Sequence, residues 1–175
     1  ETDSNSTIVQ AAGGLPGDVL KLWKSRAPGD YHSEYGYSCM GYEIAGALGI
    51  KLAQPDRQVI AFVGDGSYLM LHTEIVTAVQ EGVNLTIVLV DNHGYGCIHG
   101  LQRGCGGNSF GNEFRRRARS TARLEGAVAT VDFVKNAESL GATAVRAVTA
   151  ADLRTALSAA KEARGVHLIY VQVPA

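Results

Sequence analysis

The chain has 175 residues, of which 46% are hydrophobic and 19% are charged, and 16 Lys and Arg against 17 Asp and Glu give a net charge of −1. These values are typical of a single globular domain over residues 1–175 with a buried core, and they exclude a disordered chain. A net charge near zero offers no general attraction to nucleic acid or to an anionic membrane, and no apolar run reaches the roughly 20 residues that span a bilayer. We therefore expect neither nucleic acid nor a membrane as a partner.

The cysteines and the first residues indicate the setting of the protein. Cys39, Cys97 and Cys105 are odd in number and lack the spacing of a metal site, which favours a reducing, cytoplasmic location. The first seven residues are polar and do not resemble a signal peptide. Because the chain lacks an initial Met and its first predicted strand begins almost at once, we expect a fragment of a longer protein.

Hydrophobic runs and helical periodicities alternate along the chain. In chain order they predict a strand at 8–12, a helix at 16–26, a turn-rich stretch at 27–37, a helix at 40–53, a strand at 58–63, a helix at 69–81, a strand at 85–90, a helix at 131–140, a strand at 144–148, a helix at 151–163 and a strand at 166–173. Apolar strands separated by helices are typical of a parallel sheet covered on both faces. The predicted fold class is therefore α/β, with a doubly wound, mostly parallel sheet.

One stretch, residues 92–130, interrupts this alternation. It spans 39 residues without a clear period, and its part from Gly94 to Gly111 contains seven glycines. Long irregular inserts in compact domains are usually functional or disordered. This insert follows the carboxyl end of a predicted strand, where α/β folds bind ligands, so we expect it to border a binding site.

Polar residues flanked by glycines follow two of the predicted strands. Asp65 and Asn92 come after consecutive apolar strands and lie 27 positions apart, the spacing of one strand–helix–strand crossover. Parallel strands bring both to one edge of the sheet, where a carboxylate, an amide oxygen and a backbone carbonyl would suit Mg²⁺ or Ca²⁺. Gly66 and Ser67 open the next helix, whose first N–H groups can bind phosphate, while Gly64 and Gly66 leave room for it. The sequence therefore predicts a metal–diphosphate site.

Ordinary turns are the structural alternative for each of these positions taken alone, because Gly, Asp and Asn dominate turns. The motifs of two other phosphate-binding sites are absent. No G-x-G-x-x-G of a dinucleotide-binding fold follows a strand, and no G-x-x-x-x-G-K-[ST] of a P-loop is present. The crossover spacing of Asp65 and Asn92 favours the metal–diphosphate site over isolated turns.

The Gly-Asp-Gly sequence at 64–66, closed by Asn92, resembles the thiamin-diphosphate fingerprint of the acetolactate synthase and pyruvate decarboxylase superfamily. Residues 38–41 and 45–49 are similar to the segment that precedes this fingerprint in the family. The resemblance covers nearly the whole chain, as the C-terminal, pyrophosphate-binding domain. It implies the thiamin-diphosphate-binding fold, with thiamin diphosphate and Mg²⁺ as cofactors.

A narrower resemblance is carried by residues 11–20, 34–43, 64–74 and 109–115. These segments look like the trihydroxycyclohexanedione hydrolases, which open the ring of a cyclic diketone in myo-inositol breakdown. The resemblance thus implies a hydrolase of C–C bonds whose substrate is a small cyclic diketone.

The superfamily pattern also assigns roles to individual residues. Asp65, the Asn92 side chain and the Gly94 carbonyl would bind Mg²⁺, the Ser38 carbonyl would accept a hydrogen bond from the aminopyrimidine, and Met40 would hold the cofactor bent. The cofactor-binding residues that the resemblance implies are Ser38, Cys39, Met40, Gly64, Gly66, Ser67, His93, Gly94 and Tyr95.

The glutamate that activates the cofactor in this superfamily comes from a pyrimidine-binding domain of a partner subunit, which these 175 residues do not include. Glu34 and Glu43 flank the motif, but their surroundings do not match those of that glutamate. We therefore expect no catalytic residue in this chain, no activity of this chain alone, and a homo-oligomer (dimer or tetramer) when intact.

Other residues near the motifs keep structural interpretations. His72 could reach a substrate or be packed or solvated in a helix, and Glu74 is favourable near a helix start in any case. The cysteines are expected to be inert thiols. The basic run Arg115–Arg119 could bind nucleic acid, but a short run in a chain of net charge −1 favours a solvated loop.

Two functional alternatives to the hydrolase stay open at this point. The first is an acetolactate synthase or a 2-keto-acid decarboxylase, within the same superfamily. The second is a non-catalytic, cofactor-binding subunit of a split thiamin enzyme, whose pyrimidine-binding half would be a separate polypeptide.

Overall fold

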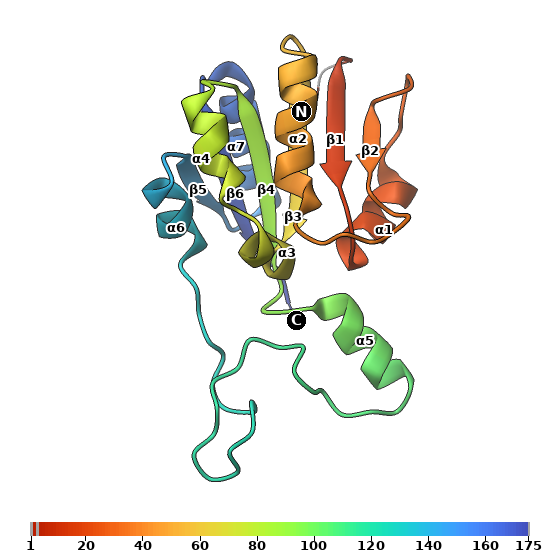
Figure 1. The fold of residues 1–175 in the computed structure, drawn as a ribbon, viewed down its shortest axis with the longest axis vertical. Coiled ribbons are helices and arrows are strands. Elements are labelled where there is room, and N and C mark those ends of the chain that lie inside the picture. Colours follow the sequence, from red (N-terminus) through yellow and green to blue (C-terminus); the bar gives the residue numbers. More distant parts are fainter. Residues whose placement is uncertain (1, 3, 175) are drawn as a thin grey trace.

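The computed structural model describes residue 2 and residues 4–174, which form a sheet with helices on both faces (Figure 1). Six strands lie in the order β2-β1-β3-β4-β6-β5, and all neighbouring strands are parallel. The strands are Ser6–Gln10 (β1), Tyr31–Ser33 (β2), Gln58–Gly64 (β3), Leu85–Asp91 (β4), Thr143–Ala147 (β5) and Val166–Gln172 (β6). The helices are Gly14–Leu22 (α1), Tyr42–Ala53 (α2), Asp65–Met70 (α3), Glu74–Gln80 (α4), Gly96–Gly104 (α5), Phe133–Ser139 (α6) and Ala150–Glu162 (α7). The predicted doubly wound α/β fold is confirmed.

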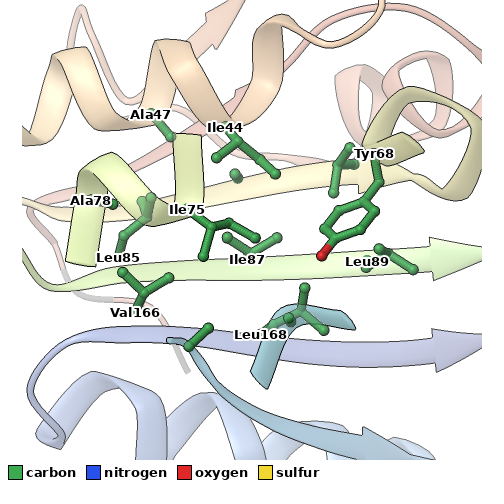
Figure 2. Packing of buried hydrophobic residues seen from close by; sticks show 14 of the residues in the cluster. Ile44, Ala47, Tyr68, Ile75, Ala78, Leu85, Ile87, Leu89, Val166 and Leu168 are labelled. Carbon is green, nitrogen blue, oxygen red and sulfur yellow. The ribbon is translucent and has the colours of Figure 1, made fainter. Parts of the chain in front are cut away.

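The larger part of the core lies between the sheet and helices α2, α3, α4 and α6. Figure 2 shows this packing at Ile44, Ala47, Tyr68, Ile75, Ala78, Leu85, Ile87, Leu89, Val166 and Leu168. On the opposite face, Ile8, Ile60 and Val88 pack against α1 and α7. Each fully buried Ile or Leu contributes about 1.5–3 kcal/mol through apolar burial. Covering both faces explains why β3 and β4 each contain a largely apolar run, Val59–Val63 in β3 and Ile87–Val90 in β4.

The predicted helix at 69–81 is wrong as one element, because the chain forms two helices there. Helix α3 ends at Met70, since Leu71 leaves the helical conformation with φ −153° and ψ 76°. The His72 ring lies against this end, with Nδ1 3.1 Å from the Tyr68 carbonyl oxygen. The break re-aims the chain so that Ile75 and Ala78 of α4 are fully buried.

Two other helices differ from their predicted bounds for reasons visible in the turns. Helix α2 begins at Tyr42 and not at residue 40, because Gly41 has the left-handed φ of 93°. Helix α1 ends at Leu22 and not at residue 26. Beyond it, the Asp30 carboxylate accepts hydrogen bonds from the N–H groups of Arg26 and Ala27 and holds them in a turn.

Two elements were not predicted. Strand β2 is a three-residue edge strand within the stretch predicted as turns, and its polar sequence carries no apolar run. Helix α5 lies within the stretch predicted as irregular, and none of its residues is buried. In Figure 1, α5 and the segment after it extend away from the sheet, which explains their lack of core residues.

The order of the strands switches at β1, because β2 lies on one side of β1 and β3 lies on the other. Loops that leave neighbouring strands on opposite sides of such a point open a crevice beyond the carboxyl ends of the strands. Within the part of the chain that the structure describes, no helix is both long and apolar enough to traverse a bilayer.

Candidate functional site

A cavity of about 430 Å³ lies at the carboxyl ends of β1, β3 and β4. Its walls come from the β1–α1 turn, the start of α3, the segment from the end of β4 into α5, and the loop before α2. The lining residues are Ala12, Gly13, Gly14, Leu15, Ser38, Met40, Gly64, Asp65, Gly66, Ser67, Val90, Asn92, Gly94, Tyr95, Gly96, Cys97, Ile98 and Leu101. The cavity therefore lies at the point where the strand order switches, which is where open parallel α/β sheets bind ligands.

Asp65, Asn92 and Gly94 converge at one wall of this cavity. One terminal atom of the Asn92 amide lies 2.9 Å from the Gly94 carbonyl oxygen and 3.2 Å from Asp65 Oδ1. The other Asp65 oxygen, Oδ2, accepts a hydrogen bond from the Gly94 N–H at 2.7 Å. The sequence prediction that Asp65 and Asn92 lie at the same edge of the sheet is confirmed.

The orientation of the Asn92 amide decides what this cluster binds, because one end of the amide donates hydrogen bonds and the other accepts them. With its nitrogen toward Asp65 and Gly94, the amide donates to both oxygens. With its oxygen there, three acceptor oxygens face one another, an arrangement that a bound cation between them would stabilise. Octahedral Mg²⁺ with bonds of 2.0–2.1 Å sets neighbouring ligand oxygens about 2.9 Å apart, close to the spacing found here. The donor set therefore fits a hard divalent cation.

Two buried carboxyl groups lie side by side in this cluster. Burial, together with the neighbouring Asp91 carboxyl, raises the pKa of Asp65 to about 7. The Asp91 carboxylate has its own donors, because Oδ1 accepts from the His93 N–H at 2.8 Å and Oδ2 from the Tyr170 hydroxyl at 2.6 Å. A cation bound beside Asp65 would therefore lower the pKa of this carboxyl group, since a nearby positive charge favours the ionised form. Among the described residues, no group of three His, Cys, Asp or Glu side chains could hold a metal, so a site here depends on the amide and the carbonyl.

Glycines make the space that this cluster needs. A Cβ on Gly94, whose φ is 149°, would lie 2.3 Å from the Asn112 carbonyl oxygen. A Cβ on Gly96 would lie 2.4 Å from the Asn92 amide. At Gly64, by contrast, a Cβ would meet no atom within 4 Å, so this position opens into the cavity. A ligand can therefore approach the backbone at Gly64.

The loop before α2 forms the opposite wall of the cavity. Ser38 has a positive φ of 57°, which is costly for a residue other than glycine and is common at functional sites. The Glu34 carboxylate holds the loop by accepting from the N–H groups of Tyr37 (3.2 Å) and Cys39 (2.6 Å). The N–H of Cys39, followed by that of Tyr37, lowers the pKa of Glu34. Glu34 therefore shapes the loop and does not line the cavity.

Most of the predicted site residues meet at this cavity. The residues that line it are Ser38, Met40, Gly64, Asp65, Gly66, Ser67, Asn92, Gly94 and Tyr95. The structure does not bring Cys39 and His93 into it. The Cys39 thiol is exposed, and His93 lines a neighbouring cavity of about 360 Å³ together with Arg146 and Gln172. Their roles toward a cofactor stay predictions.

Sequence reasoning assigned no supporting role to Asn112 and Phe114, which hold the Gly94 turn. The Asn112 carbonyl accepts from the Tyr95 N–H at 2.7 Å, and the Phe114 N–H donates to the His93 carbonyl at 2.8 Å. Asn112 is buried, and its side chain contacts Gln102 of α5 at 2.6 Å. An Asn in a glycine-rich stretch reads as a turn residue, so the sequence carried no signal for this role.

Two of the residues with open interpretations, His72 and Arg115, have structural partners. His72 stacks on Tyr68 with ring centroids 4.9 Å apart, consistent with the packed interpretation. Glu74 opens α4. In the basic run, Arg115 pairs with Glu113 at 2.9 Å, while Arg116 and Arg117 are exposed on the loop. Cys97 and Cys105 are exposed thiols, like Cys39.

The family described as "Thiamine pyrophosphate enzyme, C-terminal TPP binding domain" matches residues 11–171. This chain belongs to that family. Its curated relatives include the 3D-(3,5/4)-trihydroxycyclohexane-1,2-dione hydrolase of Bacillus cereus, which is 50% identical over 171 residues, and that of Bacillus thuringiensis, which is 49% identical. Each alignment covers 98% of this chain and 27% of the relative, so the chain spans about a quarter of their length.

A solved structure of the thiamin enzymes has the same fold. The thiamine diphosphate-dependent 4-hydroxybenzoylformate decarboxylase of Rhodococcus jostii RHA1 superposes with a TM-score of 0.85 at 26% identity, over 99% of this chain and 30% of that chain. The family match and this superposition confirm the predicted cofactor-binding fold.

Proposed function

We propose that this chain is the part of a 3D-(3,5/4)-trihydroxycyclohexane-1,2-dione hydrolase that binds thiamin diphosphate through Mg²⁺. The convergence of Asp65, Asn92 and Gly94 on one point beside the 430 Å³ cavity carries the proposal. The 50% identity to the Bacillus hydrolases over nearly the whole chain supports the choice of substrate class.

The residues present fit both the ion and the diphosphate. Asp65 Oδ1, the Asn92 amide oxygen and the Gly94 carbonyl would hold Mg²⁺, which usually completes its shell with phosphate oxygens and water. The backbone N–H groups of Gly66 and Ser67, at the start of α3, would bind the diphosphate. Gly64 gives the diphosphate its approach to the chain.

The remaining walls would hold the organic part of the cofactor. When bound, thiamin diphosphate supplies a nucleophilic carbon for attack on a substrate carbonyl. The strained Ser38 backbone would offer its carbonyl to the aminopyrimidine, and Met40 would pack against the bent cofactor. Leu15, Ile98 and Leu101 line the same cavity and would exclude water from the reacting end.

The whole protein would open the ring of a cyclic diketone by hydrolysis of a C–C bond, in myo-inositol catabolism in the cytoplasm. The activating glutamate would come from the pyrimidine-binding domain of a partner subunit, in a homodimer or homotetramer. This chain would then contribute the cofactor site and no catalytic side chain of its own.

The test uses the full-length enzyme that contains this chain. Calorimetric titration with thiamin diphosphate is expected to show binding that requires Mg²⁺, and turnover is expected on the cyclic diketone and not on pyruvate. Binding that is equal with and without a divalent ion would contradict the metal assignment. The similarity to the Rhodococcus decarboxylase keeps a 2-keto-acid decarboxylase as the second candidate, and turnover of a 2-keto acid alone would select it.

A split enzyme would behave differently in the same assay. The relatives are about four times as long as this chain, which favours a single polypeptide. Full activity after mixing this chain with a separately expressed pyrimidine-binding half, at the level of the fused protein, would instead support a separate cofactor-binding subunit.

A further inference from the structure

Glu43 is a buried acid that the proposed cofactor site does not use directly. Its residue is 1% exposed, near the start of α2, and it does not line the cavity. Burial raises the pKa of Glu43, which means that its environment disfavours the charged form. A buried carboxyl group away from the ligand needs a structural or functional reason.

The partners of Glu43 come from both sides of the site. The Ser67 hydroxyl of α3 donates to the Glu43 carboxylate, at 2.6 Å from Oε1 and 2.8 Å from Oε2. The Gly41 N–H donates both to Ser67 Oγ at 2.7 Å and to Glu43 Oε2 at 3.0 Å. Gly41, Glu43 and Ser67 thus form a closed triangle of hydrogen bonds between the loop before α2 and the helix after Gly64.

This triangle determines what Ser67 can do. A serine hydroxyl has one proton, and in this geometry the Ser67 hydroxyl donates it in a hydrogen bond to the Glu43 carboxylate. Its oxygen also accepts from the Gly41 N–H. The hydroxyl therefore has no proton left for a diphosphate oxygen, and Ser67 can serve that group only through its backbone.

We propose that Glu43 is a positioning residue, which acts through Ser67 to fix the distance between the two ends of the cofactor site. One end is the Ser38–Met40 loop, and the other is the start of α3 beside Asp65. Gly41 joins this loop to α2 with a φ of 93°, and a Cβ there would lie 3.1 Å from the Leu71 Cβ, so the triangle occupies a tightly packed junction. This inference rests on the proposed cofactor site and goes beyond it by naming what holds its two halves in register.

The proposal makes a prediction that distinguishes positioning from direct binding. In the proposed site, inorganic pyrophosphate with Mg²⁺ would contact only the α3 end, whereas thiamin diphosphate would contact both ends. In the full-length enzyme, Glu43→Ala and Ser67→Ala are expected to weaken thiamin diphosphate binding by about 10-fold or more, as loss of a supporting group does in other sites. The affinity for pyrophosphate, measured by competition, is expected to change by less than about 2-fold, because pyrophosphate needs only the α3 end of the site.

A double-mutant cycle tests whether the two residues act as a unit. The double variant Glu43→Ala/Ser67→Ala is expected to bind thiamin diphosphate no more weakly than Glu43→Ala alone. Glu43→Gln keeps one acceptor oxygen and is expected to restore part of the affinity. It also carries the test if Glu43→Ala does not fold. Glu81→Gln, at an exposed glutamate just after α4, is the matched control and is expected to bind like the parent enzyme.

Three results would overturn the inference while leaving the proposed function intact. These are an equal loss of affinity for pyrophosphate and thiamin diphosphate, additive losses in the double variant, and unchanged thiamin diphosphate affinity in Ser67→Ala and Glu43→Gln. Failure of the parent enzyme to bind thiamin diphosphate with Mg²⁺ would instead overturn the proposed function, and this inference with it.

Discussion

Two aspartates are buried at opposite edges of the same parallel sheet. Asp30 precedes β2 at the amino ends of the strands, and Asp65 follows β3 at the carboxyl ends. Their exposed fractions are 0% and 1%. Burial alone therefore does not separate a structural carboxylate from a functional one.

The groups around each carboxylate do separate them. Asp30 is surrounded by donors, because Oδ2 accepts from the N–H groups of Arg26 (2.8 Å) and Ala27 (3.0 Å), and Oδ1 from the Arg57 guanidinium at 2.7 Å. Asp65 has the Gly94 N–H as a donor, but it also faces the Asp91 carboxyl and the Asn92 amide. The pKa shifts of the two carboxyl groups have opposite signs. The hydrogen bond from the Arg26 N–H is the main cause that lowers the pKa of Asp30, whereas burial is the main cause that raises the pKa of Asp65 to about 7. An excess of acceptors around a buried acid suits a site whose ligand is a cation.

The largest effect is expected at Asp65. Asp65→Asn keeps the shape and an acceptor for the Gly94 N–H but removes the charge that a cation requires. Supporting groups around metals are worth about 10–100-fold in affinity, so loss of this ligand is expected to cost at least about 100-fold in Mg²⁺-dependent thiamin diphosphate binding. Calorimetry on the full-length enzyme measures it. Without ligands, the variant is expected to unfold at the same temperature as the parent enzyme or at a higher one, because one of two adjacent buried carboxyl groups is gone. A fall in both the cofactor affinity and the unfolding temperature would remove the contrast with Asp30.

A smaller effect is expected when the Gly94 turn is altered. Gly94→Ala places a Cβ 2.3 Å from the Asn112 carbonyl oxygen at a φ of 149°. Such strain costs on the order of 1–3 kcal/mol, and relief by moving Asn112 would displace the Gly94 carbonyl, so weaker thiamin diphosphate binding is expected as well.

Gly100→Ala in α5 is the matched control for that variant. A Cβ at Gly100 would meet no atom within 4 Å, and its backbone is helical. Alanine in a helix interior is favoured over glycine by roughly 0.5–1 kcal/mol, so this variant is expected to bind the cofactor unchanged and to protect the amides of α5 from exchange. Equal behaviour of the two alanine variants would show that the Gly94 turn is not built around its lack of a side chain.

These contrasts also explain how much the sequence could predict. The central strands β3 and β4 were predicted to within a residue at each end, because strands buried on both faces form continuous apolar runs. The edge strand β2 and helix α5 were missed, since β2 contributes only the partly buried Tyr31 to the core and α5 has no buried residue, so neither has a periodic apolar pattern. Predictability therefore follows burial against the sheet.

The same reasoning applies to the site. Asp65 and Asn92 were predicted to meet because the crossover spacing fixes their edge of the sheet, and the structure confirms it. Asp91, Glu43 and Asn112 act through contacts that are distant in sequence, such as the Tyr170–Asp91 hydrogen bond across 79 positions. Spacing along the chain carries no information about such contacts, so supporting residues could not be predicted as the ligands were.

At the other edge of the sheet, Asp30→Asn is expected to destabilise the protein without changing cofactor affinity. The amide nitrogen of Asn would face either the N–H groups of the 26–27 turn or the guanidinium of Arg57, whose side chain is only 11% exposed. Thermal unfolding of the full-length enzyme should occur at lower temperature, with faster exchange of the Arg26 and Ala27 amides. Asp18→Asn removes a pair with Lys21 in which both side chains are more than 70% exposed, and such pairs contribute little. A loss of cofactor affinity in Asp30→Asn would mean that the two edges are coupled.

The smallest effect is the acid dependence of stability, which tests the sign of the Asp30 shift. The Arg26 N–H, with further help from Ala27 and Arg57, holds the pKa of Asp30 below its ordinary value of 3.8 in the folded state. The unfolded chain then binds the proton more readily, so the stabilising contribution is complete above pH 3.8 and is lost as the pH falls through the lowered folded-state pKa. Urea unfolding at pH 7, 4 and 3 should show the parent enzyme losing stability on acidification more steeply than Asp30→Asn, so that the difference between them shrinks. Equal losses of stability in the two proteins would mean that other groups cause the acid sensitivity. They would also contradict the lowered pKa that the hydrogen-bond donors around Asp30 imply.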